Sequence, residues 1–329
     1  MSSSSPKFFV TPCDHLTVFT ASGADANSFL QSQLTQDVSI VSPSQSALAG
    51  FCTAQGRLWA SMLLAQRQAE GEILGVLSTD LAESFLKRLR MFVLRSKVTL
   101  GISTDLVVHG VRACTTDMAA LSQQAGGNLP ASVWSSACLR SGLWIRIPSA
   151  TEDSVRFLLL AKSEQIQSVL DNLGDRAHLL QDRELWRAQD IQAGLAWIEA
   201  ATQDMFIAQT LNLDLVGAVS FTKGCYPGQE VVARAHYRGT IKRRMHLARI
   251  DRVTPDVKAG SDVFDPNEPD NPVGRLIQVA VGSDGNTPTW VLFEAPFNCL
   301  EGDPLRAASA SGPPMVMQPL PYEVATPSA

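Results

Sequence analysis

The chain has 329 residues, enough for two or three domains, and its 45% hydrophobic and 18% charged residues exclude a protein that is disordered throughout. The formal net charge of −5 argues against a protein that coats nucleic acid with its whole surface, so an anion-binding role would need a local patch. No run approaches the ~20 apolar residues that span a bilayer, and the start, MSSSSPKFFV, lacks the apolar segment of a signal peptide. We therefore expect a cytoplasmic protein with no membrane partner.

The first hundred residues mix strand and helix patterns. Residues 23–38 predict a helix with Phe29, Leu30, Gln33 and Leu34 on one face. A second helix is expected from Asp80, where the spacing to Glu83 is typical of an N-cap and its partner, and its apolar residues recur every four positions. Strands are expected around these helices, at residues 15–19, 47–53, 58–65, 72–78 and 95–102.

The next region has a clearer pattern of alternating elements. Residues 105–111 predict a strand, 115–126 a helix, and 142–148 and 155–161 two further strands. Residues 163–174 predict a helix that begins on a serine and ends at a glycine. The order β-α-β-β-α is most of a ferredoxin-like unit.

From about residue 241 the pattern changes to short strands separated by turns. The runs MHLARI, VGRLIQVAV and TWVLFEA alternate with turn-forming segments rich in Gly, Pro, Asn and Asp. Such closely spaced strands are typical of a small all-β barrel or sandwich.

The six cysteines, at positions 13, 52, 114, 138, 225 and 299, are widely and irregularly spaced. None forms a C-x-x-C pair, whereas zinc and iron–sulfur sites commonly use closely spaced cysteines. We therefore expect neither a disulfide framework nor a metal site made by this chain alone.

One cysteine has unusual neighbours, in the segment FTKGCYPGQEVVARAHYRG (221–239). Pro227 is suited to the first turn of a helix, which would place Cys225 just before that helix. Positive charge from Lys223 and from the helix N-terminus would favour the thiolate form of Cys225. Gly224 and Gly228 would permit unusual dihedral angles or the close approach of a ligand.

A packing role for Cys225 remains open at this point. Most free cysteines are inert, and Cys225 would then be a small buried residue in a glycine turn. No Cys–His protease arrangement is evident, because His236 lies eleven residues further on.

The segment that follows is rich in basic residues and has no acidic ones. Between residues 231 and 250 these are Arg234, Arg238, Lys242, Arg243, Arg244 and Arg249. The run is either a solvated basic face or a site for an anion such as a phosphate, RNA or a polycarboxylate. The first five are our candidate anion patch.

The string K-G-C-Y-x-G-Q-E (223–230), followed by V-A-R, closely resembles the signature of the YgfZ family of folate-binding proteins, relatives of the glycine-cleavage T-protein (aminomethyltransferase). The resemblance covers most of the chain. It includes the strings at residues 23–37, 86–95, 186–194, 206–213 and 271–275.

This resemblance implies an α+β fold of the T-protein type, with three domains around a central channel, ferredoxin-like βαββα units and a C-terminal β-barrel. We place a folate-binding domain at residues 1–103 plus 182–240, a ferredoxin-like domain at 104–181 and the barrel at 241–329. The implied cofactor is tetrahydrofolate or a derivative, and the implied role is support of the synthesis or repair of [4Fe-4S] proteins, including enzymes that modify tRNA. Implied partners are iron–sulfur client or assembly proteins, with tRNA as a further partner through the basic patch.

The resemblance also implies site residues. Cys225 would be the functional thiol, with Lys223 as its modulator and Gly224 and Gly228 as motif glycines. The implied folate contacts are Phe92, Arg95, Trp186, Asn212, Tyr226, Gln229 and Glu230.

One departure bears on catalysis. The T-proteins have a G-G-x-x-D-D string after the second strand, whereas this chain has Trp59 and Ala60 where the carboxylates would stand. Without a positioned acid, proton transfer on folate has no obvious agent, so whether the chain is an enzyme stays open. The alternatives are a true aminomethyltransferase and a non-enzymatic module that binds tRNA or protein.

Overall fold

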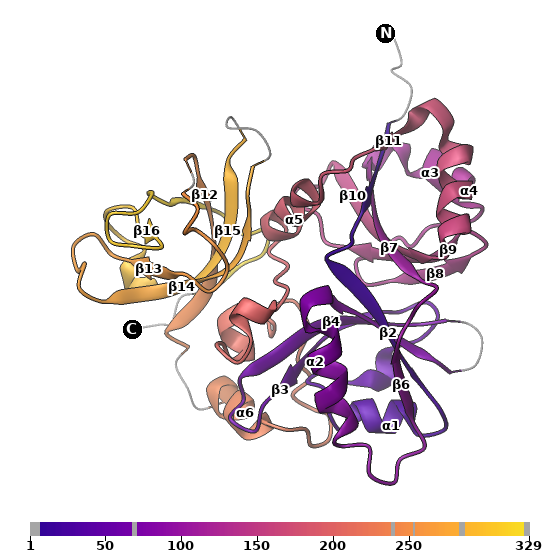
Figure 1. Cartoon of the computed structure of the whole chain (residues 1–329), viewed down its shortest axis with the longest axis horizontal. Coiled ribbons are helices and arrows are strands. Elements are labelled where there is room, and N and C mark those ends of the chain that lie inside the picture. The colour runs from indigo at the N-terminus through magenta and orange to yellow at the C-terminus, as the bar shows by residue number, and fades with distance from the viewer. Residues whose placement is uncertain (1–6, 68–70, 238–240, 253, 283–286, 326–329) are drawn as a thin grey trace. The chain divides into compact units, whose positions relative to one another are not determined.

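The computed structural model describes residues 7–67, 71–237, 241–252, 254–282 and 287–325. Contacts divide the chain into two compact units, and each is built from several segments. One unit contains residues 1–31, 37–48 and 62–186, and the other contains residues 32–36, 49–61 and 187–329. The fold is mixed α+β with three sheets, as expected (Figure 1).

A six-stranded sheet with two helices on one face lies in the first unit (Figure 1). Trp144 and Phe157 of the sheet share a core with Leu121 of α3 and Val169 of α4, because each helix presents one apolar stripe to the sheet. The elements β7, α3, β9, β10 and α4 occur in the predicted order, but strand β8, between α3 and β9, was not predicted. The strands, in spatial order, are β11 (Ala177–Leu179), β1 (Phe8–Pro12), β7 (Val107–Cys114), β10 (Ser154–Ala161), β9 (Gly142–Ile147) and β8 (Ser136–Leu139), and the helices are α3 (Met118–Ala125) and α4 (Ser163–Leu173).

The sheet extends beyond the predicted ferredoxin-like segment of residues 104–181. Strand β1, which was expected in the folate-binding domain, pairs antiparallel with β7 and parallel with β11. Residues 8–12 therefore belong to this sheet.

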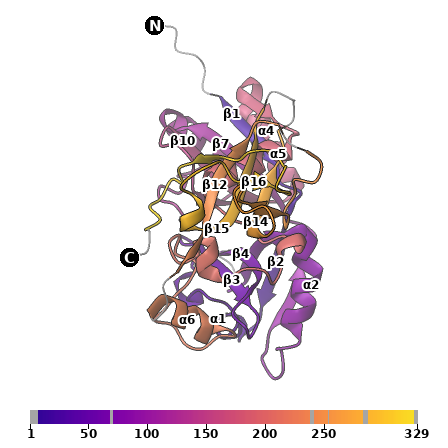
Figure 2. The same cartoon turned by 90° about the vertical axis from the view of Figure 1, so that its left-hand side faces the viewer.

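A five-stranded sheet has the order β3 (Ala47–Cys52), β4 (Leu58–Gln66), β5 (Ile73–Ser78), β2 (Leu16–Ser22) and β6 (Thr99–Ile102). Helix α2 (Thr79–Arg90) contacts β2, β5 and β6, and Figure 2 shows it beside β2. Leu81, Phe85 and Leu89 of this helix are buried, as their spacing predicted. Strands β3 and β4 each contribute residues to both units.

The third sheet, in the second unit, curls into a half-barrel (Figure 1). Its strands, in order, are β16 (Arg306–Ala307), β13 (Asp262–Phe264), β14 (Pro272–Ala280), β15 (Thr289–Pro296), β12 (Arg243–Ile250) and β17 (Val316–Gln318). Over the described part of the chain, β16 and β17 are the two edges, so the sheet is an open half-barrel where a small β-barrel was expected. Val263, Leu276 and Phe293 belong to its core.

The described residues also form the α-helices α1, α5 and α6. Helix α1 (Ala26–Gln31) is shorter than the predicted helix at residues 23–38, and α5 (Arg183–Gln192) and α6 (Gln229–Tyr237) flank an irregular stretch of the second unit. In the described ranges, no helix combines the length and the hydropathy needed to cross a membrane.

Candidate functional site

Cys225 is exposed and lies on a loop, residues 221–228, which we call the cysteine loop. Exposure does not single it out, because Cys114 and Cys138 are also exposed free thiols. Cys13 and Cys52 are buried, and burial raises the pKa of Cys52 to about 12. What distinguishes Cys225 is the set of contacts that hold its loop.

A tight turn follows the cysteine. The amide of Gln229 donates to the carbonyl of Tyr226 (3.3 Å), and the amide of Tyr226 donates to Oε1 of Gln229 (3.3 Å). Between them stand Pro227 and Gly228, whose φ of +81° suits the third position of a type II turn. Helix α6 starts at Gln229. Pro227 therefore lies before the helix and not in its first turn, because Pro227 and Gly228 form the β-turn that precedes it. Cys225 lies four positions before the helix, further than expected.

The turn packs closely against the hairpin turn at residues 53–57, which joins β3 to β4. A Cβ atom on Gly228 would lie 2.4 Å from the carbonyl oxygen of Thr53, and one on Gly56 would lie 2.6 Å from the Cβ of Val231. Both glycines are therefore required by packing. Gly224 differs, because a Cβ there would meet nothing within 4 Å.

Lys223 anchors the loop from its other side. Its ammonium group donates to the carbonyl of Leu34 (2.6 Å) and to that of Gln36 (2.9 Å), and lies 5.3 Å from the centre of the Tyr226 ring. Tyr226 is 8% exposed, and burial raises the pKa of its hydroxyl group. These contacts give Lys223 a positioning role in addition to the electrostatic one predicted for it.

The start of the loop is stacked on the end of α6. The rings of Phe221 and His236 are 3.7 Å apart at 14°, and Tyr237, 66% exposed, meets both rings edge-on. The cysteine loop is thus held at residues 221, 223 and 226–228, with Cys225 exposed between these points.

The predicted folate residues are distributed over both units. Phe92 and Arg95 are exposed and Trp186 is buried in the first unit, where Trp186 packs on Gly110 and under the guanidinium of Arg156 (4.3 Å). The others are in the second unit, where Tyr226 and Gln229 are hydrogen-bonded to each other and Glu230 is exposed.

Asn212 belongs to a buried polar network that sequence reasoning missed. In a left-handed conformation (φ +58°), it donates to the carbonyl of Met245 (3.0 Å) and contacts the hydroxyl of Tyr322 (3.5 Å). Across the residues that the structure describes, its Oδ1 atom and Oε1 of Gln209 are buried with no hydrogen-bond donor. A buried acceptor without a donor is unusual and is what a site for a polar ligand would leave.

The candidate anion patch is only partly at the surface. Arg234 and Lys242 are exposed, and Arg238 lies outside the described residues. Arg244 is buried and pairs with Asp214 through two bonds (2.6 and 3.0 Å), so it stabilises the interior and its charge is already balanced. Arg243 pairs with Glu294 and lines a pocket.

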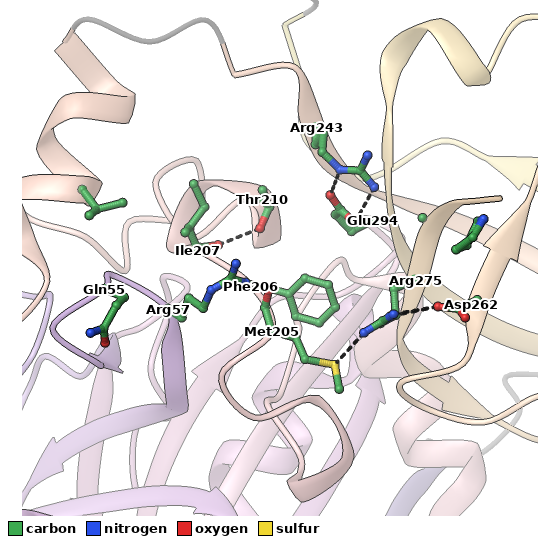
Figure 3. Close-up of a pocket in the computed structure, with 13 residues that line it drawn as sticks. Gln55, Arg57, Met205, Phe206, Ile207, Thr210, Arg243, Asp262, Arg275 and Glu294 are labelled. Atoms are coloured by element: carbon green, nitrogen blue, oxygen red, sulfur yellow. Dashed lines mark hydrogen bonds and ion pairs between the residues drawn. The ribbon is translucent and has the colours of Figure 1, made fainter.

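That pocket, of about 510 Å³, lies within the second unit (Figure 3). It brings together Arg57 of the hairpin turn, Phe206, Arg243 of β12 and Arg275 of β14. No feature of spacing in the sequence indicated this grouping, because the residues come from separate segments.

No family model matches the chain. Among curated proteins, it is 31% identical over 319 residues to the tRNA-modifying protein YgfZ of Yersinia pseudotuberculosis, covering 95% of this chain and 92% of the relative. The chain belongs to the YgfZ family. The YgfZ protein of Yersinia enterocolitica is 30% identical over 318 residues, covering 94% of this chain and 91% of that one.

A solved structure shares the fold of this YgfZ-family protein. It is the glycine cleavage system aminomethyltransferase T from Bartonella henselae, with a TM-score of 0.71 over 94% of this chain and 84% of that chain, at 15% identity. The T-protein-like fold expected from the sequence is confirmed. The positions of Trp59 and Ala60 on β4 carry no carboxylate.

Proposed function

We propose that this protein is a tetrahydrofolate-binding accessory factor of the cytoplasm that supports the synthesis or repair of [4Fe-4S] proteins, including tRNA-modifying enzymes, and acts through Cys225. The observation that carries the proposal is the exposed thiol of Cys225 on a loop fixed at both sides. When a partner binds, a thiol on a fixed loop loses less conformational entropy than a thiol on a flexible loop, so binding costs less free energy. The YgfZ relatives are named as tRNA-modifying proteins, which supports the choice of client.

Folate binding is part of the same proposal. The T-protein-like fold favours it. The proposal includes three domains around a central channel, with the segment 104–181, joined by residues 8–12, as the ferredoxin-like domain. Within the second unit, the unpaired acceptors of Asn212 and Gln209 fit a ligand that offers N–H donors, as a reduced pterin does. Trp186 is too deeply buried to stack on a ligand unless its neighbours move, so we assign it a supporting role.

The test is complementation of a strain that lacks its own YgfZ-family protein. We expect Cys225→Ser to fail to restore the activity of [4Fe-4S] enzymes while the purified variant melts like the parent. Cys114→Ser is the matched control, because Cys114 is also an exposed free thiol, and it should complement fully. Full complementation by Cys225→Ser would refute the role of the thiol.

Aminomethyl transfer is the alternative that the fold allows. Trp59 and Ala60 argue against it, because neither side chain can accept a proton from a folate nitrogen. We expect no release of methylenetetrahydrofolate when the pure protein is mixed with an aminomethyl-lipoyl carrier protein and tetrahydrofolate. A third possibility, an RNA-binding module, would show salt-sensitive binding that is unchanged in Cys225→Ser.

A further inference from the structure

The pocket in the second unit has the size of a small-molecule site, about 510 Å³. Its walls come from the hairpin turn 53–57, the loop 205–210, Val231 of α6 and the half-barrel. It contains none of the residues to which the sequence assigned folate contacts. It is therefore a separate candidate site.

Three guanidinium groups face this pocket from different sides (Figure 3). Arg243 is paired with Glu294 through Nε and Nη2, and Arg275 is paired with Asp262 (2.8 Å). Arg57 has no carboxylate partner among the described residues and donates to the carbonyl of Met205. Three arginines and two carboxylates give the lining a formal net charge of +1.

The carboxylates also orient the arginines. Glu294 is 7% exposed and receives both bonds from Arg243, so that guanidinium is held in one geometry while its side chain stays 42% exposed. Arg275 is 40% exposed in its pair. Guanidinium groups that are held in this way present their remaining N–H donors to a ligand, and carboxylates and phosphates match their geometry.

Gln55 and Thr210 add polar groups to the lining, and most of the other lining residues are apolar. Met205, Phe206, Ile207, Val231 and Pro272 contribute to the walls, and the Phe206 ring lies between Arg57 and Arg275 (Figure 3). A ligand that fills the space therefore needs an apolar body as well as a charged group.

We propose that this pocket binds a small molecule that carries one oxyanion group, a carboxylate or a phosphate, on a flat apolar body. The single net positive charge favours one anionic group over a polyphosphate chain. Arg57 is the principal ligand of the anion, because its charge is the one that no carboxylate balances. The inference does not depend on the folate or iron–sulfur proposal.

Three probes of similar shape test the charge requirement on the full-length protein: benzoate, phenyl phosphate and neutral benzamide. We expect ligand-detected NMR titration to give a Kd for benzoate or phenyl phosphate at least tenfold lower than that for benzamide. The ratio between benzoate and phenyl phosphate identifies the preferred oxyanion. Charged probes that bind no tighter than benzamide would overturn the proposal.

Variants test the assignment to Arg57. Arg57→Gln should abolish the preference for charged probes, and Arg57→Lys, which keeps the charge, should retain part of it. Arg249→Gln is the control, because Arg249 pairs with Asp251 and does not line the pocket. If Arg57→Gln does not fold by circular dichroism, Arg275→Gln should weaken the same binding instead. An unchanged preference in a folded Arg57→Gln variant would exclude this site.

The last arm separates the pocket from the folate site. Saturating tetrahydrofolate should leave the affinity for the charged probe unchanged. If tetrahydrofolate displaces the probe from the parent protein but not from Arg57→Gln, the pocket is a folate site. That result would overturn the proposal that the pocket binds a different ligand.

Discussion

Among single residues, two glycines near Cys225 have different physical roles: Gly224 directly precedes the cysteine, and Gly228 lies in the turn that follows it. Gly228 has a φ of +81°, and a Cβ there would overlap the backbone of residue 53, which cannot move like a flexible side chain. Gly224 has open space around it. The motif therefore contains one glycine required by the fold and one that the fold does not require, beside the exposed thiol.

We expect Gly228→Ala to lower the free energy of unfolding by about 2 kcal/mol or more, because alanine is strained in the left-handed region and would also clash with Thr53. Gly224→Ala should change it by less than about 0.5 kcal/mol. Urea denaturation of the two variants measures this contrast. Equal stabilities would show that the turn adapts and that packing does not explain Gly228.

His246 on β12 gives a prediction about pH. It is 7% exposed, packs near Phe293 and Phe297, and donates from Nε2 to the carbonyl of Ala295; burial lowers its pKa to about 4. The unfolded chain binds this proton near pH 6.5, whereas the folded protein binds it only near pH 4. The contribution of neutral His246 to the free energy of unfolding is therefore complete above pH 6.5. As the pH falls toward 4, this contribution decreases by up to about 3 kcal/mol.

Melting temperatures measured between pH 7 and pH 4 should show this loss. His246→Gln keeps an N–H donor for Ala295 but does not titrate, so its stability should fall less steeply over the same range. If the two proteins have parallel profiles, other groups cause the acid sensitivity.

At the scale of elements, the short segment between α1 and the 3-10 turn Val38–Ile40 secures the stretch that leads into the cysteine loop. The Thr35 hydroxyl donates to the carbonyl of Ala218 (2.7 Å) and accepts from the amide of Gly50 (2.7 Å). Thr35 is fully buried. One side chain therefore satisfies two backbone groups.

Thr35→Val preserves the shape of this side chain but leaves both backbone groups unpaired. We expect a loss of about 2–4 kcal/mol, since an unsatisfied buried group costs about 1–3 kcal/mol. Thr17→Val on β2 is the comparison and should be nearly neutral, because valine suits a strand. Chemical denaturation compares the two. A small effect at Thr35 would indicate that water or a rearranged loop replaces the hydroxyl.

The same segment explains where prediction from sequence succeeded and where it failed. Residues 23–38 have helical periodicity, yet α1 ends at Gln31, because Thr35 and Leu34 leave the helix to pair with Gly50 and Phe51. Local patterns predicted β7-α3-β9-β10-α4, where each element buries its own apolar face. They did not predict the pairing of β1, the partners of Lys223 or the grouping of Arg57 with Arg275, because those depend on contacts between distant segments.

At the scale of the whole molecule, the second unit is discontinuous in sequence. It needs residues 32–36 and 49–61 in addition to residues 187–329. We expect the fragment 187–329 alone to be unfolded or only partly ordered, because Ala218, Lys223 and Ile198 would lose their partners Thr35, Leu34 and Ser61. Amide NMR spectra test this. Well-dispersed signals that match those of the full chain would show that the half-barrel and loop fold independently.

Folate binding is also a property of the whole chain. We expect tetrahydrofolate to bind the full protein with a Kd in the micromolar to tens-of-micromolar range, roughly −6 to −8 kcal/mol. Asn212→Leu should weaken it at least tenfold, because it removes the unpaired buried acceptor. Calorimetry measures both, and no heat or thermal shift at millimolar folate would remove the claim.

The anchoring of the cysteine loop also has a consequence for the time at which the site forms. Lys223 meets Leu34 across 189 positions of chain, and Thr35 meets Ala218 across 183. Contacts of such separation form late, because a long loop must close before the contact stabilises it. During synthesis, residue 34 leaves the ribosome long before residue 223 exists. The thiol of Cys225 is therefore positioned only after helix α6, which ends at Tyr237, has been made, and a chain that stops before it carries the residue without the site.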